Sequence, residues 1–182
     1  MRLAFDLSVL RHPPAGTARY AIELHRAMVE QGDGDEIVAA NGWPRRPRAP
    51  RWRLANLASD LGWLTIGADA VALRRRVDAW YSPSNSLPLA LPRPTVVTIH
   101  DTTFLSGMHD RWYARYARLV YGAAGRSADA VIAPSEASRL RLIADLGVHP
   151  ERVTVAYPGV EHLLSVVPAD RDPRLQIGRA HV

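Results

Sequence analysis

The 182-residue sequence contains no cysteine, which excludes disulfide bonds, thiolate metal sites and a cysteine nucleophile. It also contains no lysine: all 23 basic residues are arginine, a bias that a GC-rich genome explains better than function does. Against 18 acidic residues this gives a net charge of +5, which suits an anionic partner such as a phosphate, a nucleic acid or an acidic membrane surface. Composition alone does not choose among these partners.

Long apolar runs are absent as well. No segment approaches the roughly 20 apolar residues that cross a bilayer, because Arg, Asp, Pro or Gly interrupts each candidate. The first residues, Met1 to Asp6, reach a charge without the apolar core of a secretory signal. We therefore expect a cytoplasmic globular protein, with a length that suits one domain.

Several familiar motifs are missing. The first loop has a single glycine, Gly16, so it is neither the G-x-G-x-x-G of dinucleotide-binding proteins nor a P-loop. A nicotinamide-dependent dehydrogenase is further disfavoured, because no ribose-binding acidic residue follows the second expected strand. G-x-S-x-G, the nucleophile motif of α/β-hydrolases, is also absent. No second histidine lies at metal-ligand spacing from His100, so we expect no metal site.

What the sequence does contain is a regular alternation of β-branched apolar runs with amphipathic helical patterns. The expected strands are 2–7, 36–40, 77–81, 95–99, 130–133 and 153–156. The expected helices are 18–31 with Thr17 as N-cap, 55–76 with interruptions at Gly62 and Gly67, one around 112–123, and one capped by Ser135 that ends at Gly147. This alternation predicts an α/β fold with a Rossmann-like, doubly wound, mainly parallel sheet.

The expected strand at 95–99 ends on His100 and Asp101. In an open parallel sheet, ligands bind beyond the carboxyl ends of the strands, so these side chains would face a crevice. There they could act in acid–base chemistry or donate to a sugar hydroxyl. A histidine that caps a loop, with an aspartate that orients it, is an equally good interpretation of this segment.

Two other loops carry weaker signals. Gly16 and Thr17 lie where a helix N-terminus could bind a phosphate, although a plain turn is about twice as well supported by the pattern. Ser135 and Glu136 sit where a cap and a first-turn carboxylate stabilise a helix by about 1 kcal/mol, so capping alone could explain them. Residues 43–53 are predicted to be an exposed basic loop. Solvated surface explains its arginines best, and a docking face for anionic lipid or a lipid-linked acceptor is the alternative.

Four segments, taken in order, resemble the N-terminal half of family 4 glycosyltransferases: Phe5-Asp6 with residues 16–20, then residues 97–101, 127–135 and 150–160. The resemblance implies the GT-B architecture, in which two Rossmann-like domains face a cleft. It also implies transfer of a hexose, such as mannose or glucose, from a nucleotide diphosphate sugar with retention of configuration. The acceptor would be a glycan or a lipid-linked sugar, no metal would be required, and no nucleic acid is expected as a partner.

The same resemblance implies roles for particular residues. His100 would lie near the transferred sugar, with Asp101 beside it. The remaining implied positions are Gly16, Thr17 and Arg19 at the donor diphosphate, Asn85 and Phe104 on the acceptor side, and Ser135, Glu136 and Gly159 at the cleft and the exit from the domain. Peripheral contact with an anionic membrane, at its inner face, would use the arginine-rich loop 45–53.

One departure from the family matters. The basic side chains and the E-x7-E pair of the second domain cannot be placed in this sequence, so we expect the chain alone to be inactive. The expected boundaries are a domain over 1–161, the start of a linker over 162–176, and a tail at 177–182 that matches a translated sequencing adapter. A stand-alone Rossmann-like module that binds a nucleotide or phosphate ligand without catalysis is the alternative.

Overall fold

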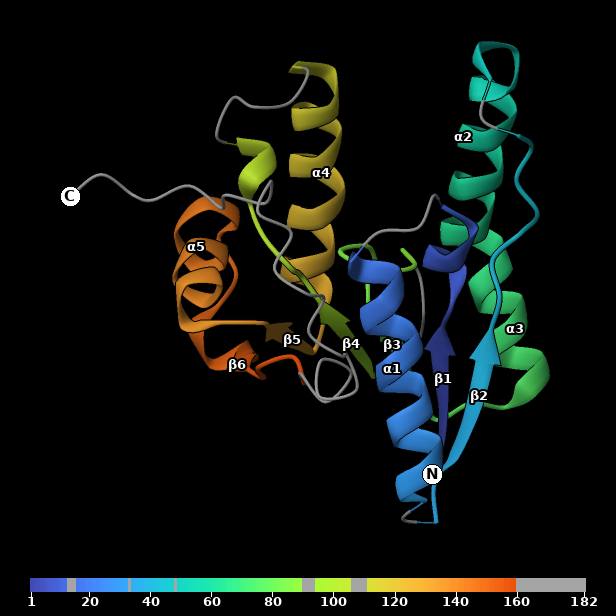
Figure 1. The fold of residues 1–182 in the computed structure, drawn as a ribbon, viewed down its shortest axis with the longest axis vertical. Coiled ribbons are helices and arrows are strands. Elements are labelled where there is room, and N and C mark those ends of the chain that lie inside the picture. The colour runs from blue at the N-terminus through green and yellow to red at the C-terminus, as the bar shows by residue number, and fades with distance from the viewer. Residues whose placement is uncertain (13–15, 33, 48, 90–93, 106–110, 160–182) are drawn as a thin grey trace, which may run out of the picture.

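The computed structural model describes residues 1–12, 16–32, 34–47, 49–89, 94–105 and 111–159 (Figure 1). In these ranges six strands form one parallel sheet in the order β2-β1-β3-β4-β5-β6. The strands are β1 (Arg2–Asp6), β2 (Glu36–Ala40), β3 (Ala79–Ser82), β4 (Thr95–Thr98), β5 (Ala130–Ala133) and β6 (Val153–Val155). Every predicted strand is present and the Rossmann-like α/β class is confirmed. The predicted linker and tail at 162–182 lie outside the described residues.

Helices cover the sheet unequally on its two faces. Helix α1 (Gly16–Gln31) packs on the face that carries Leu3, Phe5 and Tyr81. The opposite face is covered by α3 (Ala68–Arg75), α4 (Arg111–Ser127) and α5 (Glu136–Leu146), whose apolar side chains join one core with Trp80 and Val97. Helix α2 (Arg53–Gly62) extends beyond the carboxyl edge of the sheet (Figure 1). From β3 to β6 the strands follow one another across the sheet in sequence order. Right-handed crossovers then place α4 and α5 on one face.

The long helix predicted over 55–76 is interrupted between Gly62 and Gly67, as these glycines indicated. A π-helical segment, η3 (Trp63–Gly67), joins α2 to α3. The ring of Trp43 lies against this segment: a Cβ on Gly62 would clash with it, and one on Gly67 would lie 3.0 Å from it. Glycine at these positions therefore lets the Trp43 ring lie directly on the helix backbone.

The sequence predicted N-cap residues for two helices, and one of the two predictions is correct. Helix α1 already includes Gly16, so Thr17 lies inside the first turn and its predicted N-cap role is wrong. Ser135 does cap α5, because its Oγ accepts a hydrogen bond from the Ser138 amide at 3.1 Å. Gly147 ends that helix in the left-handed conformation, with φ of 68°, as expected.

The exposed basic loop predicted over 43–53 is only partly correct. Arg46, Arg51 and Arg53 are exposed, but residues 43–46 form a strap fastened along α2. The Arg46 amide donates to Asn56 Oδ1 at 2.8 Å and Asn56 Nδ2 donates back to the Arg46 carbonyl at 3.2 Å. The carboxamide thus pairs with the strap as a neighbouring strand would, a partnership invisible in the loop's own sequence. The loop then enters a short 3₁₀ turn, η2 (Pro50–Trp52), and α2.

The remaining short turns are 3₁₀ helices at the ends of strands and helices. They are η1 (Ser8–Arg11), η4 (Thr103–Leu105) and η5 (Pro150–Arg152). Among the described residues, no helix combines the length and the apolar character that crossing a bilayer demands.

Candidate functional site

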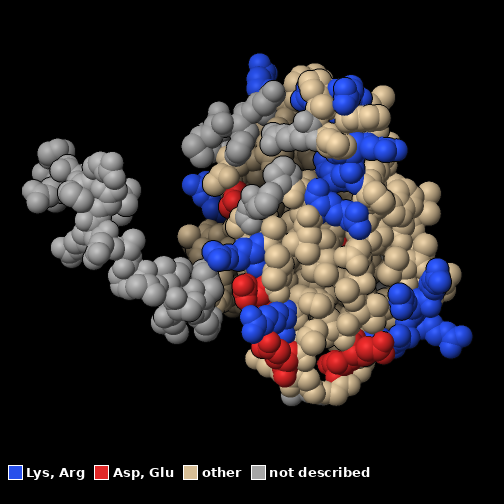
Figure 2. Space-filling model, turned by 45° about the vertical axis from the view of Figure 1, so that its right-hand side comes forward, with Lys and Arg blue, Asp and Glu red and all other residues tan. Residues whose placement is uncertain are grey.

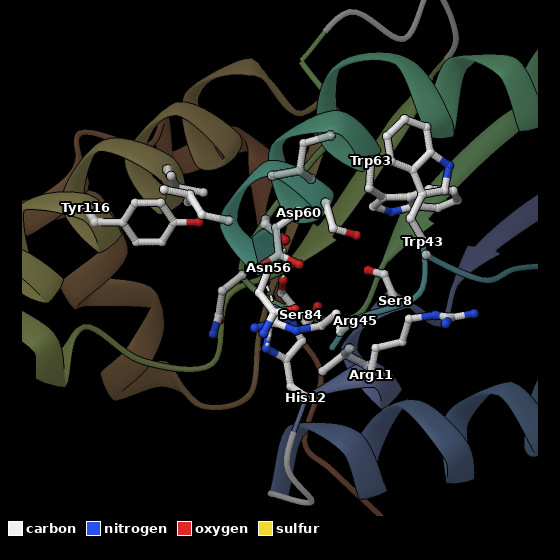
Figure 3. A pocket seen from close by; sticks show the side chains of 18 of the residues that line it. Ser8, Arg11, His12, Trp43, Arg45, Asn56, Asp60, Trp63, Ser84 and Tyr116 are labelled. Atoms are coloured by element: carbon white, nitrogen blue, oxygen red, sulfur yellow. Dashed lines mark hydrogen bonds and ion pairs between the residues drawn. The ribbon is translucent and has the colours of Figure 1, made fainter. Parts of the chain in front are cut away.

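A cleft of about 1050 Å³ opens at the carboxyl edge of the sheet, between η1, the 43–46 strap, α2 and α4 (Figure 3). Its lining includes Ser8, His12, Arg45, Asp60, Asn85 and Tyr116. This is the edge at which open parallel sheets bind ligands, so the geometry agrees with the expectation drawn from strand order.

His100 follows β4 and is held from several directions. Its Nε2 lies 2.9 Å from the Pro83 carbonyl, which can only accept, so Nε2 carries the proton in the neutral ring. Its amide donates to Asn85 Oδ1 at 2.8 Å. Burial lowers the pKa of His100, partly offset by the Pro83 contact. The residue is therefore a neutral imidazole at pH 7 whose remaining hydrogen-bonding atom, Nδ1, is an acceptor.

Asp101 is not the partner of the His100 ring. Its Oδ1 accepts from the Thr103 amide at 2.8 Å and from the Thr103 hydroxyl at 2.6 Å, and the residue is exposed. This is an Asx-type turn that shapes the loop after β4. The sequence offered an aspartate that orients the histidine, whereas the structure shows an aspartate that caps the loop.

A hydroxyl cluster that the sequence did not indicate lies beneath His100. Tyr81 and Thr98 are 2.6 Å apart at their oxygens, and the Tyr20 hydroxyl lies 3.2 Å from Tyr81 and 3.3 Å from Thr98. Tyr20 also packs edge-to-face on the His100 ring, with centroids 4.9 Å apart. Burial raises the pKa of Tyr81. The cluster joins α1, β3 and β4 and supports the imidazole from below.

Asp6, at the end of β1, belongs to a segment that carries the family resemblance, but sequence reasoning gave it no role. It is 2% exposed, and its Oδ1 accepts from the Ser8 amide at 2.8 Å. Its Oδ2 lies 3.4 Å from both Trp63 Nε1 and Ser82 Oγ. Burial raises its pKa, which these hydrogen bonds partly offset. A carboxylate that ends a buried strand was the available signal.

The residues predicted at the donor diphosphate are not gathered by this structure. Gly16 starts α1, and an added Cβ there would meet nothing within 4 Å. Thr17 lines the cleft, whereas Arg19 is exposed and is not among the lining residues. Their roles at the diphosphate stay predictions.

The predicted acceptor-side residues differ from each other. Asn85 lines the cleft, adopts a positive φ of 42° and fixes the His100 backbone. Phe104 is 2% exposed and packs edge-to-face on Tyr121, with centroids 5.1 Å apart. Phe104 is thus a core residue, and it reaches the cleft only through Tyr121, which lines it.

The residues predicted at the domain exit have local structural tasks. The Ser135 hydroxyl donates to Ser138 Oγ at 3.0 Å, and that hydroxyl donates to the His100 carbonyl at 3.2 Å. Glu136 pairs with Arg139 at 3.3 Å on the surface of α5, and Gly159 is exposed beyond β6. Ser135 therefore helps to position the histidine loop as well as capping its own helix.

Charged side chains meet on the other side of the cleft, where the sequence predicted only a surface loop. Arg45 Nη1 lies 2.5 Å from Asp60 Oδ2 and within 3.2 Å of both ring nitrogens of His12. Burial, and next the Arg45 charge, lower the pKa of His12, so its neutral ring accepts from the guanidinium. Among the described residues no three His, Asp or Glu side chains are grouped as metal ligands would be.

Comparison with known proteins identifies the family and agrees with the fold. The family model described as Glycosyltransferase Family 4 matches residues 14–162. The solved structure of Anabaena HepE in complex with UDP-glucose is similar to the chain, with a TM-score of 0.50, 22% identity and coverage of 88% of this chain. HepE in complex with UDP gives 0.48 and 23% over 87% of this chain. The chain covers 44% of each of those structures. No match was found among curated sequences. This chain belongs to glycosyltransferase family 4.

Proposed function

We propose that this chain forms the acceptor-side domain of a retaining GT-B hexosyltransferase. The complete enzyme would transfer a hexose from a nucleotide diphosphate sugar to a glycan or lipid-linked acceptor, without a required metal. The observation that carries the proposal is the cleft at the carboxyl edge of a family 4 domain. The half-buried, neutral His100 is not among its lining residues but is hydrogen-bonded to Asn85, which is. The solved HepE structure contains UDP-glucose, which favours a donor of that class.

The chemistry of His100 follows from its contacts. Because Nε2–H is bound to the Pro83 carbonyl, the ring can use Nδ1 to accept a hydrogen bond from a hydroxyl of the transferred sugar. Tyr20 fixes the plane of the ring and Asn85 fixes its backbone. We propose that His100 orients the sugar ring in this way. Stabilisation of the leaving diphosphate would come from cationic groups outside the described residues.

The experiment is a transfer assay on the complete gene product that contains this chain. A panel of nucleotide sugars would be incubated with glycan and lipid-linked acceptors, and proton NMR would record the anomeric configuration of the product. We expect transfer with retention, undiminished by EDTA, and no transfer by the 182-residue chain alone. A complete protein that binds a nucleotide sugar but transfers nothing to any acceptor would favour the non-catalytic binding module instead.

We further propose a cytoplasmic location with peripheral contact at an anionic membrane. Arg46, Arg51 and Arg53 are exposed close to Leu54, which is 78% exposed, and Trp112 at the start of α4 is 79% exposed. Figure 2 shows arginines gathered at the upper end of the molecule, where Figure 1 places the outer ends of α2 and α4. Apolar and cationic side chains together suit a charged lipid surface. Sedimentation of the protein with anionic but not with zwitterionic vesicles would support this contact. Failure to sediment with either kind of vesicle would contradict it.

A further inference from the structure

Charge in the carboxyl-edge cleft is strongly unbalanced. Arg11, Arg45 and Arg53 line it, whereas Asp60 is the one carboxylate among its described lining residues. His12 adds no positive charge at neutral pH, because burial and the neighbouring guanidinium lower its pKa. Arg11 and Arg53 are exposed, whereas Arg45 is half-buried, so the Arg45 charge is the least screened by solvent. The excess of positive charge favours an anionic ligand.

Arg45 is the centre of this charge. Its side chain is 21% exposed, and its hydrogen bonds to His12 and Asp60, among the described residues, all run from Nη1. The guanidinium has further donors at Nε and Nη2. Arg45 and Arg11 also line an adjoining cavity of about 380 Å³. In Figure 3 the Arg45 side chain lies beside the His12 ring, whereas the Arg11 side chain extends away from it. Such planar forks suit the oxygens of a phosphate or carboxylate.

The strap holds Arg45 in place before any ligand binds. On one side of it the Pro44 carbonyl accepts from Ser59 Oγ at 3.1 Å, and on the other side Arg46 is paired with Asn56 in both directions. Asp60 then fixes the guanidinium itself at 2.5 Å. A donor that is already positioned loses little conformational entropy on binding, which favours affinity.

Aromatic side chains supply a second kind of contact in the same cavity. Trp43, Tyr113 and Tyr116 line it together with Arg45. Aromatic side chains join a large apolar surface to a polar group, as a sugar ring also does, so they suit a carbohydrate beside its charged substituent. The cavity thus combines surface for a sugar with donors for an anion.

We propose that the Arg45 side of the cleft binds an oxyanion of the acceptor, a phosphate or a carboxylate, with Arg45 and Arg11 as its donors. That the anion belongs to the acceptor rests on the proposed function, whereas the existence of an anion site rests on the cleft alone. Asp60 positions Arg45 and also competes with the ligand for it. The site therefore selects an acceptor with a negative charge over a neutral glycan of the same size.

The test is a titration of the full chain with inorganic phosphate, followed by NMR at the arginine Nε–Hε signals. We expect a saturable shift of the Arg45 signal. In Arg45→Gln, phosphate binding followed at the backbone amides of the strap weakens at least about tenfold. Asp60→Asn, which removes the competing carboxylate, tightens binding. Arg74→Gln, an exposed cation on α3 outside the cleft, serves as the matched control and leaves binding unchanged. Equal phosphate affinity in wild type and in a folded Arg45→Gln variant overturns the proposal, as does the absence of any shift.

Three further probes identify the source of the anion. Octyl phosphate represents a lipid carrier, glucuronate an acidic glycan, and glucose the neutral control. Displacement of inorganic phosphate by octyl phosphate or by glucuronate supports the site and names its class, whereas displacement by glucose at equal concentration contradicts it. Failure of this proposal is distinguishable from failure of the proposed function. If the complete protein binds the anion but transfers no sugar, the anion site is supported and the proposed function is contradicted. If the complete protein transfers sugar but Arg45→Gln leaves anion binding unchanged, only the anion site is contradicted.

Discussion

Two polar clusters lie at the carboxyl edge of this sheet, and they are built in opposite ways. The cluster around His100 is neutral and joins hydroxyls and an imidazole. Hydrogen bonds tie it to β3 and β4, and the Tyr20 hydroxyl and ring tie it to α1. The cluster around Arg45 is charged, opens into the cleft and is held by a loop strapped to α2. The first is suited to position one ring, and the second to bind a charged group from solution.

The strongest way to separate the two interpretations of the His100 segment is to compare His100→Ala with Asp101→Asn in the complete gene product. We expect sugar transfer to fall about 100-fold or more in His100→Ala, because a positioned hydrogen-bonding group is lost beside the sugar. Asp101→Asn keeps an acceptor for the Thr103 turn, so its loss should stay below about tenfold. Initial rates at saturating donor measure both. Equal losses of transfer rate in the two variants would show that Asp101 takes part in the reaction.

The packing behind the charged cluster is tested by Gly62→Ala. The added methyl group meets the Trp43 ring, so the strap must shift, and overpacking of this kind costs about 1–3 kcal/mol. Gly16→Ala is the matched control, because its methyl group meets nothing within 4 Å. Urea unfolding of both variants gives the difference in unfolding free energy. Equal stability of the two would show that Trp43 does not pack where the structure places it.

The neutral cluster is tested by Tyr81→Phe. Removing this hydroxyl deletes the 2.6 Å hydrogen bond to Thr98 and should cost about 1 kcal/mol of stability. Tyr20 and Thr98 lie 3.3 Å apart and can still bond to each other, which limits the loss. Thermal unfolding measures it. Tyr113→Phe, which alters an exposed hydroxyl pair on α4, should change stability less.

A smaller effect concerns pH. His12 and His100 both have pKa values below the ordinary 6.5, chiefly because neighbouring protein atoms partly desolvate their rings, although His12 is exposed and His100 is half-buried. The unfolded chain therefore binds more protons just below pH 6.5, so the stability these rings contribute is present above that pH and is lost as the pH falls through their folded values. Unfolding free energies at pH 5 and pH 8 should differ less in the double variant His12→Asn/His100→Asn than in the wild type. An unchanged difference would mean that neither ring is held neutral.

The two clusters also differ in how far the sequence revealed them. His100 was found because it ends a β-branched strand, and a parallel sheet places such ends at one edge. Its supports at Tyr20 and Tyr81 were not found, because their meeting depends on β3 lying between β1 and β4. Strand composition predicts that a strand exists, and strand order appears only when the whole chain packs.

The Arg45 cluster was missed for a different reason. Prolines among arginines correctly predicted an irregular segment over 43–53, but the partners of that segment lie on the following helix: Asp60 pairs with the Arg45 side chain and Asn56 with the Arg46 backbone. Local pattern shows which residues avoid regular structure. It does not show when side chains of a neighbouring helix substitute for a missing strand.

The most direct test of the difference between the clusters is a steady-state comparison of His100→Ala and Arg45→Gln in the complete gene product with a phosphate-bearing acceptor. If the neutral cluster orients the transferred sugar and the charged cluster binds the acceptor, His100→Ala lowers kcat at a nearly constant acceptor KM. Arg45→Gln should raise the acceptor KM about tenfold at a nearly constant kcat. The reverse pattern, or the same change in both variants, would contradict the account.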